Sequence, residues 1–122
     1  MHAIAVWGAV EVEPEVEKWL AALPDFSFGQ AAFAIDLLSD DGPLLGEPYT
    51  RQLDGKLREL RFYVEGRRWR ITYFIASGRR IVLLTVFPKA ARRERNEIER
   101  ARLAMARCLA EAHTVDEGDQ RW

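Results

Sequence analysis

Two turn signals, Glu65-Gly66 and Ser77-Gly78, divide the middle of the chain into three short segments that are rich in β-branched and aromatic residues. Such segments, bounded by glycine-containing dipeptides, are typical of antiparallel strands joined by tight turns. Residues 57–87 are therefore predicted to form three consecutive strands. This stretch limits the possible folds most strongly, because a tight turn decides which residues lie opposite each other.

The turns also assign side chains to faces of the predicted sheet. If Glu65-Gly66 is centred in the first turn, Arg61 lies opposite Arg70 and Leu60 opposite Ile71. Alternation then predicts an apolar face, which becomes the core, and a polar face behind it. With Ser77-Gly78 centred in the second turn, the apolar face comprises Leu60, Phe62, Val64, Trp69, Ile71, Tyr73, Ile75, Val82, Leu84 and Val86. The polar face gathers Glu59, Arg61, Tyr63, Arg68, Arg70, Thr72, Thr85 and, if the alternation continues past Pro88, Lys89.

Helical periodicity surrounds these strands. Residues 14–23 are predicted to form an amphipathic helix that opens with Pro14 at its first position. A second helix is expected to have Ser27 as its N-cap and to stop at Gly42-Pro43, with Ala31, Phe33, Ala34, Leu37 and Leu38 as its apolar positions. A last helix over about 94–112 presents Ile98, Ala101, Met105, Cys108, Leu109 and Ala112 on one face.

These elements predict an α+β domain. With a short apolar strand over residues 3–7, the order is β-α-α-β-β-β-α, and the sheet of about four strands packs against helices. At 122 residues and 48% hydrophobic content, the chain suits one compact domain over residues 1–112, followed by a polar tail over 113–122.

Composition excludes several classes of protein. The single Cys108 excludes an internal disulfide and a cysteine zinc site, and it is predicted to be a buried small hydrophobic residue. His2 and His113 lie near the ends, and no metal-binding or glycine-rich phosphate motif is present, so neither a metal nor another cofactor is expected. Acidic residues interrupt the N-terminal stretch, which predicts neither a signal peptide nor a membrane span and favours a cytoplasmic protein.

Charge is distributed unevenly along the chain. Residues 1–50 carry one basic and nine acidic side chains, whereas residues 51–100 carry fourteen basic and six acidic ones. A locally basic surface attracts phosphates or an acidic protein, whatever the net charge of the whole chain. A solvated, arginine-rich face with no partner is the alternative interpretation.

The predicted pair of Arg61 and Arg70 bears on whether this basic surface binds a partner. Two arginines that oppose each other across strands repel, unless an anion or a carboxylate lies between them. One interpretation is a phosphate cradle on the open face of the sheet. The other is an Arg-Glu-Arg surface network, because Glu59 lies one diagonal neighbour away.

Three stretches together resemble a known family. They are KLRELRF (56–62), GRRWRITYFIASGRRIVLLTVFPK (66–89) and NEIERARLAMARC (96–108). Their order and spacing resemble the RelE/ParE superfamily of bacterial toxins, and more closely its HigB-like, phage-derived branch. The resemblance covers roughly residues 4–112, and its specific part lies within 57–101. It implies a small α+β toxin that is encoded beside an antitoxin, expected here to be of the helix-turn-helix type.

The resemblance also marks site residues. It points to Arg61, Arg70 and Lys89, which are the residues that strand pairing gathers on the polar face. Cleavage of RNA at its own 2′-hydroxyl needs a base, a charge clamp for the phosphorane and an acid for the departing oxygen. Arginine suits the clamp, and among the titratable groups Glu59, Lys89 and Tyr63 we favour Lys89, whose pKa neighbouring arginines would lower. The predicted catalytic residues are Arg61, Arg70, Lys89 and Glu59, and the predicted RNA-binding residues are Arg68, Tyr63, Arg92 and Arg93.

Three functional hypotheses follow. The first is an mRNA endoribonuclease toxin (an mRNA interferase) that acts at the ribosome and is neutralised by an antitoxin. The second is a ParE-like toxin that grips gyrase without cutting RNA. The third is a degenerate homologue that only binds nucleic acid or an antitoxin, because residues 94–112 lack the tyrosine or histidine that some relatives carry there.

Overall fold

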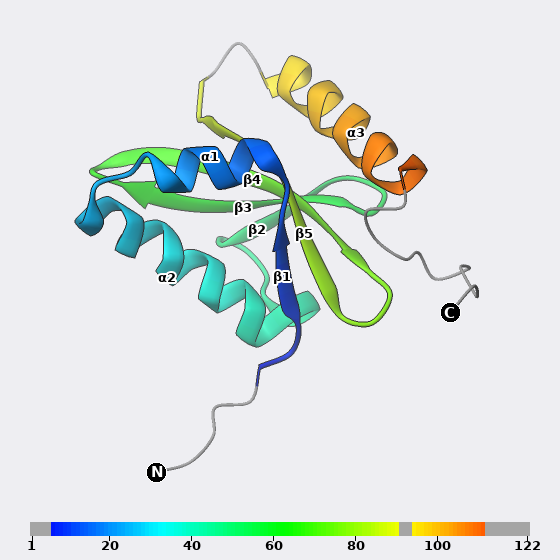
Figure 1. The fold of residues 1–122 in the computed structure, drawn as a ribbon, viewed down its shortest axis with the longest axis horizontal. Coiled ribbons are helices and arrows are strands. Elements are labelled where there is room, and N and C mark those ends of the chain that lie inside the picture. Colours follow the sequence, from blue (N-terminus) through cyan, green and yellow to red (C-terminus); the bar gives the residue numbers. More distant parts are fainter. Residues whose placement is uncertain (1–5, 91–93, 112–122) are drawn as a thin grey trace.

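The computed structural model describes residues 6–90 and 94–111. These residues form one five-stranded sheet and three α-helices (Figure 1). In chain order the elements are β1 (Ala9–Val12), α1 (Pro14–Ala21), α2 (Asp25–Asp41), a 3-10 turn η1 (Gly42–Leu44), β2 (Thr50–Asp54), β3 (Leu57–Val64), β4 (Arg67–Ala76), β5 (Arg80–Pro88) and α3 (Glu94–Ala110). The strand order is β1-β5-β4-β3-β2, with β1 parallel to β5 and the other neighbours antiparallel. The predicted α+β class is confirmed, with one strand more than expected.

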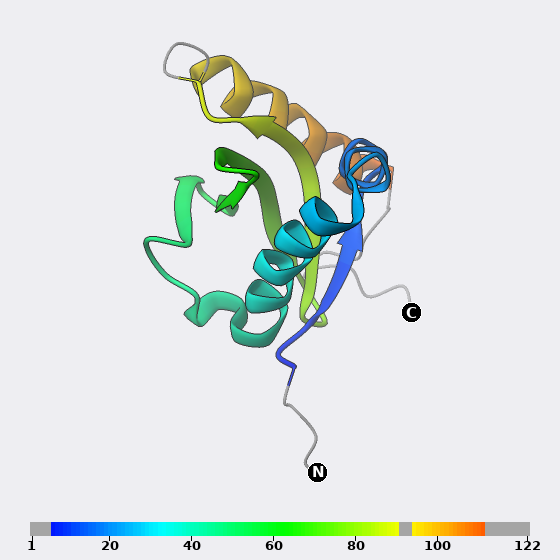
Figure 2. The ribbon, with the colours of Figure 1, turned by 90° about the vertical axis from the view of Figure 1, so that its left-hand side faces the viewer.

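Helices cover both faces of the sheet (Figures 1 and 2). On one face, α1 and α2 pack against a core that includes Leu60, Ile71 and Tyr73. On the other face, α3 packs through Ala101, Ala104 and Cys108 against a second apolar cluster, which contains Leu57, Phe74, Ala76, Val82 and Leu84. The expectation of an open polar face is therefore wrong, because α3 covers much of it.

The first hairpin has the predicted register. Glu65 and Gly66 form the turn, both with positive φ, and Arg61 pairs with Arg70. The second turn differs from the prediction, since Ala76 pairs with Arg80 across three turn residues instead of two. Arg79, at φ 57°, is the additional turn residue.

This additional residue moves part of β5 to the opposite face. Ile81 and Leu83 join the core under α1 and α2, whereas Val82 and Leu84, which were predicted there, lie under α3. A bulge opposite Thr72 and Tyr73 then shifts the register by one more residue. Two shifts of one residue restore the original alternation, so the predicted positions of Val86 in the core and of Thr85 on the same face as Thr72 are confirmed.

The sheet edges depart from the prediction. The first strand lies at Ala9–Val12, while Val6 and Trp7 of the expected strand over 3–7 belong to no strand, and residues 3–5 lie outside the described residues. Pairing begins at Ala9 because its partner strand β5 begins at Arg80. Strand β2 was not predicted, although its Asp54-Gly55 end is a strong hairpin signal.

The two N-terminal helices form where expected, but α2 has a different N-cap and exposes one of its predicted apolar positions. Its N-cap is Pro24, and Ser27 lies buried inside the first turn, where its hydroxyl contacts the Glu65 carboxylate. Phe33, predicted to be in the core, is 67% exposed. The predicted positions Ala31, Ala34 and Leu38 are buried, together with Ser27, and these mostly small side chains allow the helix to lie close to the sheet.

Gly42 ends α2 and allows the N-terminal segment to pack beneath it. Its φ is 54°, a conformation that L side chains rarely adopt, and its amide bonds to the Leu38 carbonyl. The ring of Trp7 lies directly over its Cα, so that an added Cβ would come within 2.3 Å of a ring carbon. The end of the helix predicted at Gly42-Pro43 is confirmed. The contact with Trp7 is one reason why a glycine is needed there.

We predict that Gly42→Ala destabilises the protein by more than about 1 kcal/mol, because it adds both a strained φ and an overlap with Trp7. The free energy of unfolding in urea measures the loss. Gly29→Ala is the matched control, since a Cβ there meets nothing within 4 Å and the site is helical. Equal stability of the two variants would contradict the prediction.

Candidate functional site

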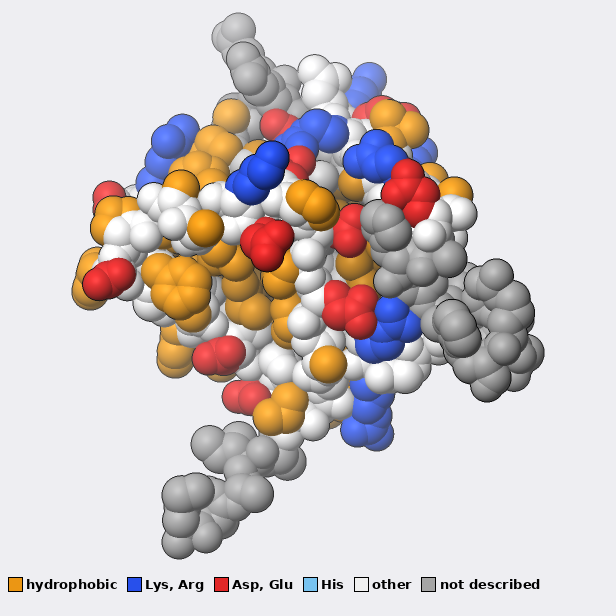
Figure 3. All heavy atoms as spheres, viewed as in Figure 1, with side chains coloured by type: hydrophobic (Ala, Val, Ile, Leu, Met, Phe, Trp, Pro, Cys, Tyr) orange, Lys and Arg blue, Asp and Glu red, His pale blue; other side chains and the backbone are white. Residues whose placement is uncertain are grey.

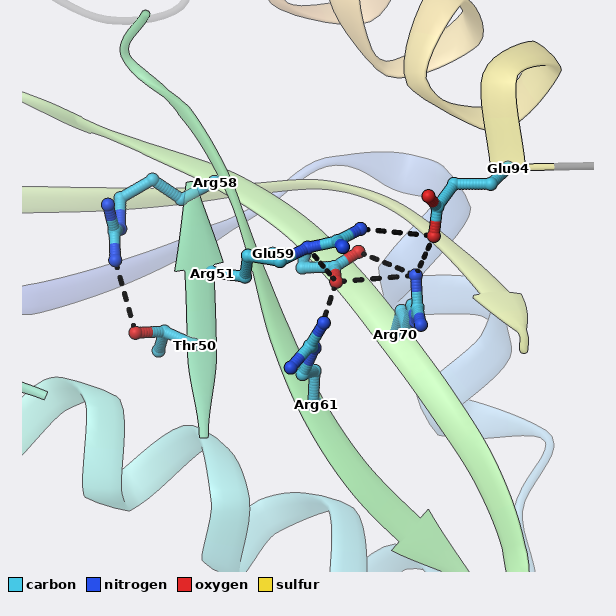
Figure 4. Close-up of polar contacts among 7 residues, drawn as sticks. All are labelled: Thr50, Arg51, Arg58, Glu59, Arg61, Arg70 and Glu94. Carbon is cyan, nitrogen blue, oxygen red and sulfur yellow. Dashed lines mark hydrogen bonds and ion pairs between the residues drawn. The ribbon is translucent and has the colours of Figure 1, made fainter. Parts of the chain in front are cut away.

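A buried carboxylate lies at the centre of the arginine cluster. Glu59 on β3 is 0% exposed and faces Arg51 on β2 as its cross-strand partner. Its Oε2 atom lies 3.0 Å from Arg61 Nε, 3.3 Å from Arg51 Nε and 3.3 Å from Arg70 Nη1 (Figure 4). One carboxylate is thus shared by three guanidinium groups.

The Glu59 carboxylate explains how Arg61 and Arg70 can lie opposite each other. The Arg61 amide bonds to the Tyr49 carbonyl on the side away from β4, so Arg61 and Arg70 form a pair without mutual backbone hydrogen bonds. The Cα atoms of such a pair lie only about 4.5 Å apart, which makes an intervening anion necessary. Glu59 supplies that anion, as the network interpretation anticipated, but in the interior and not at the surface.

A second carboxylate approaches from α3. Oε1 of Glu94, in the first turn of this helix, lies 2.5 Å from Arg70 Nη1 and 3.0 Å from Arg51 Nη2 (Figure 4). The side chain of Glu94 is 43% exposed, whereas that of Arg70 is only 7% exposed. Glu94 therefore lies between Arg70 and the solvent.

Arg70 and Arg51 lower the pKa of Glu94. The hydrogen bond from Arg70 is the largest cause, and the nearby charge of Arg51 adds to it, while partial burial opposes both. With both carboxylates ionised, three arginines face two glutamates, which leaves the cluster with a net charge of +1.

A groove of about 1080 Å³ opens beside this network. One wall is α2 with the adjoining loop, and it presents exposed hydrophobic side chains, among them Phe26 and Phe33 at 75% and 67% exposure. The other wall comes from β3, β4 and the residue that follows β5, and it carries Arg61, Tyr63, Arg68, Arg70 and Lys89. Figure 3 shows hydrophobic side chains at the surface around α1 and α2, with Lys and Arg side chains along the upper part of the molecule.

The groove brings together most of the site residues predicted from sequence. Five of them line it directly, and Arg68 lies 5.9 Å from the Tyr63 ring in a cation–π contact. Glu59 lies beneath it and is not exposed. Arg92 and Arg93 lie outside the described residues.

Sequence reasoning missed Arg51 and Glu94. Arg51 was missed because strand β2 was not predicted. The Asp54-Gly55 signal indicates a hairpin, but the irregularity between Gln52 and Asp54 sets the pairing of Arg51 with Glu59. Glu94 was missed because it reaches the cluster from α3, which the pairing of strands does not place.

The family model described as "Phage derived protein Gp49-like (DUF891)" matches residues 18–107, which include α2, every strand from β2 to β5 and most of α3. The chain belongs to the Gp49-like family. No curated protein matches it.

Membership of the Gp49-like family has functional consequences. This phage-derived family is a family of RelE-like toxins, which supports a toxin-antitoxin context and an antitoxin partner. The Gp49-like match spans the whole arginine network, since Arg51, Glu59, Arg61, Arg70 and Glu94 all fall within it.

The described part of this Gp49-like chain also bears on metal binding, thiol chemistry and membrane insertion. Residues 6–90 and 94–111 contain no group of three or more histidine, cysteine or acidic side chains arranged to hold a metal. Cys108 is buried as predicted, and burial raises the pKa of its thiol to about 11, which leaves it unreactive near neutral pH. Among the same residues, no helix is both long and apolar enough to cross a membrane.

We predict that Glu59→Gln lowers the free energy of unfolding by about 3–5 kcal/mol, because it removes the charge that three arginines share at a fully buried position. Urea denaturation measures the change. Glu99→Gln on α3 is the control, since the ion pair between Glu99 and Arg102 is exposed and its loss should change stability by less than about 1 kcal/mol. A similarly small effect of Glu59→Gln would show that the network is not structural.

Glu94 should make stability depend on pH. Its pKa in the folded protein is lower than the ordinary value of 4.5, so its contribution is present above that value and disappears as the pH falls through the folded pKa. The stability difference between the unaltered protein and Glu94→Gln should therefore be constant from neutral pH to about 5 and then shrink as the pH is lowered to about 3. Urea denaturation at each pH tests this, and a difference that grows on acidification would contradict it.

Proposed function

We propose that this protein is the toxin of a toxin-antitoxin pair and an mRNA endoribonuclease of the HigB-like kind, active in the cytoplasm at the ribosome. The observation that carries the proposal is the groove, in which Arg61, Arg68, Arg70 and Lys89 line one wall together with the exposed ring of Tyr63. Basic side chains beside an exposed aromatic ring are what single-stranded RNA requires, because phosphates bind cations and splayed bases stack on rings.

We assign a role to each groove residue from the exposure of its side chain and from the groups that it can contact. Arg61 keeps a partly exposed guanidinium, of which Nε bonds to Glu59, and its remaining N–H groups can bind a phosphate. Lys89 is exposed in the groove, and we assign to its ammonium group the donation of a proton to the departing 5′-oxygen, while solvent water takes the proton of the attacking 2′-hydroxyl. Tyr63, held by Arg68, stacks on a base next to the cleaved bond.

Glu59 has a different role in this proposal. It was expected among the catalytic groups, but it is fully buried and its carboxylate already contacts three guanidiniums. We therefore assign it to positioning, in which it holds Arg61 and Arg70 together so that a phosphate can contact both.

The hydrophobic wall of the groove favours a second candidate, a toxin that grips a protein such as gyrase. Phe26 and Phe33 on α2 are largely exposed, and exposed aromatic side chains are enriched in protein interfaces. The same wall also offers a docking surface to the antitoxin, which we expect to be of the helix-turn-helix type.

We predict that Lys89→Ala and Arg61→Ala each abolish growth arrest after induction in bacteria and the new mRNA ends found by primer extension. Both substitutions remove a groove cation, whereas the matched control Lys18→Ala removes an exposed cation from α1, which does not line the groove, and should remain toxic. Circular dichroism of each purified variant verifies that it is folded.

Two outcomes would contradict the nuclease. Growth arrest with an SOS response and intact mRNA would indicate the gyrase-binding toxin. Viable cells that show neither response on induction of the unaltered protein would indicate a homologue that only binds nucleic acid or antitoxin.

A further inference from the structure

Glu94 occupies the place on Arg70 where an incoming anion would bind. The Arg70 side chain is 7% exposed, and its Nη1 atom already contacts both Glu59 and Glu94. Of these two carboxylates only Glu94 is partly in solvent, at 43% exposure, and it belongs to a helix that is not part of the sheet. An external phosphate can therefore take the solvent-side place on the Nη1 atom of Arg70 only if Glu94 moves.

The exchange of Glu94 for a phosphate is balanced in charge. The cluster holds three arginines against two glutamates, and a phosphodiester carries one negative charge, as Glu94 does. Both groups present two oxygens that can accept bonds from a guanidinium. Removal of Glu94 alone would leave two unpaired positive charges, whereas replacement by phosphate keeps the net charge at +1.

The large groove and a smaller pocket of the surface meet at Arg70. Arg70 lines the large groove with Arg61 and Lys89, and it also lines a smaller pocket of about 360 Å³ whose other side includes Glu94 and Glu97. The guanidinium thus lies at the boundary of the two, and Glu94 approaches it from the small pocket. Because Glu94 belongs to α3 and not to the sheet, its departure from Arg70 does not require any strand to separate.

We propose that Glu94 is an internal competitor of RNA: it neutralises Arg70 and Arg51 in the free protein and is displaced by a backbone phosphate on binding. This inference rests on the proposed function, because it assumes that RNA binds in the groove. In this inference the contact of Glu94 with Arg70 and Arg51 lowers the affinity of the site for nucleic acid.

The test measures binding of a fluorescent single-stranded RNA of about ten nucleotides, 2′-O-methylated so that it cannot be cleaved. Glu94→Gln is expected to bind it roughly three- to tenfold more tightly, the range for loss of one competing, partly exposed charged contact. Glu94→Ala is also expected to bind the RNA more tightly, which would show that the gain in affinity does not come from the glutamine side chain. Circular dichroism verifies that both variants are folded.

Glu99→Gln is the matched control, since it makes the same charge change on the same helix without a contact to Arg70 and should alter affinity by less than about twofold. Binding by Glu94→Gln that is no tighter than binding by Glu99→Gln would overturn the competition while leaving the groove as the RNA site. Failure of the proposed function gives a different pattern, in which Arg61→Ala and Lys89→Ala bind the RNA as tightly as the unaltered protein.

Discussion

The buried carboxylate of Glu59 is the interaction on which the rest of the site depends. Strand pairing brings Arg61 and Arg70 together on one face, and β2 adds Arg51 opposite Glu59. Charges of like sign at this spacing are unfavourable in a low-dielectric interior, and α3 makes the surroundings more enclosed by covering the face. A single carboxylate at the centre makes the three positive charges compatible with a folded sheet, and it also orients them.

The site lies where this network reaches the surface. Beside it, α2 and the strands diverge to form the groove, with an apolar wall on one side and a basic wall on the other. A toxin that must bind both a phosphate backbone and a neutralising protein needs both kinds of surface. The Gp49-like family supplies the toxin context, and the groove supplies the chemistry from which we propose RNA cleavage.

How much of the site could be predicted depended on the elements involved. Arg61 and Arg70 were found because both lie on one hairpin whose turn is readable from sequence. Glu94 and the burial of Glu59 were not found, because both result from the packing of α3 against a strand face that is distant in sequence. The expectation that this face is open was wrong for the same reason, since helical periodicity shows that α3 has an apolar face but not which surface it covers.

The sequence by itself determined the α+β class, the position of most helices and strands, and the pairing of Arg61 with Arg70, because these follow from periodicity and from a two-residue turn. The tertiary structure decided the rest. In β5 it added Arg79 to the turn and a bulge opposite Thr72 and Tyr73, and these two shifts decide which residues face each core. It also placed Glu94 on Arg70, because the energy of an ion pair depends on distance in space and not on separation along the chain.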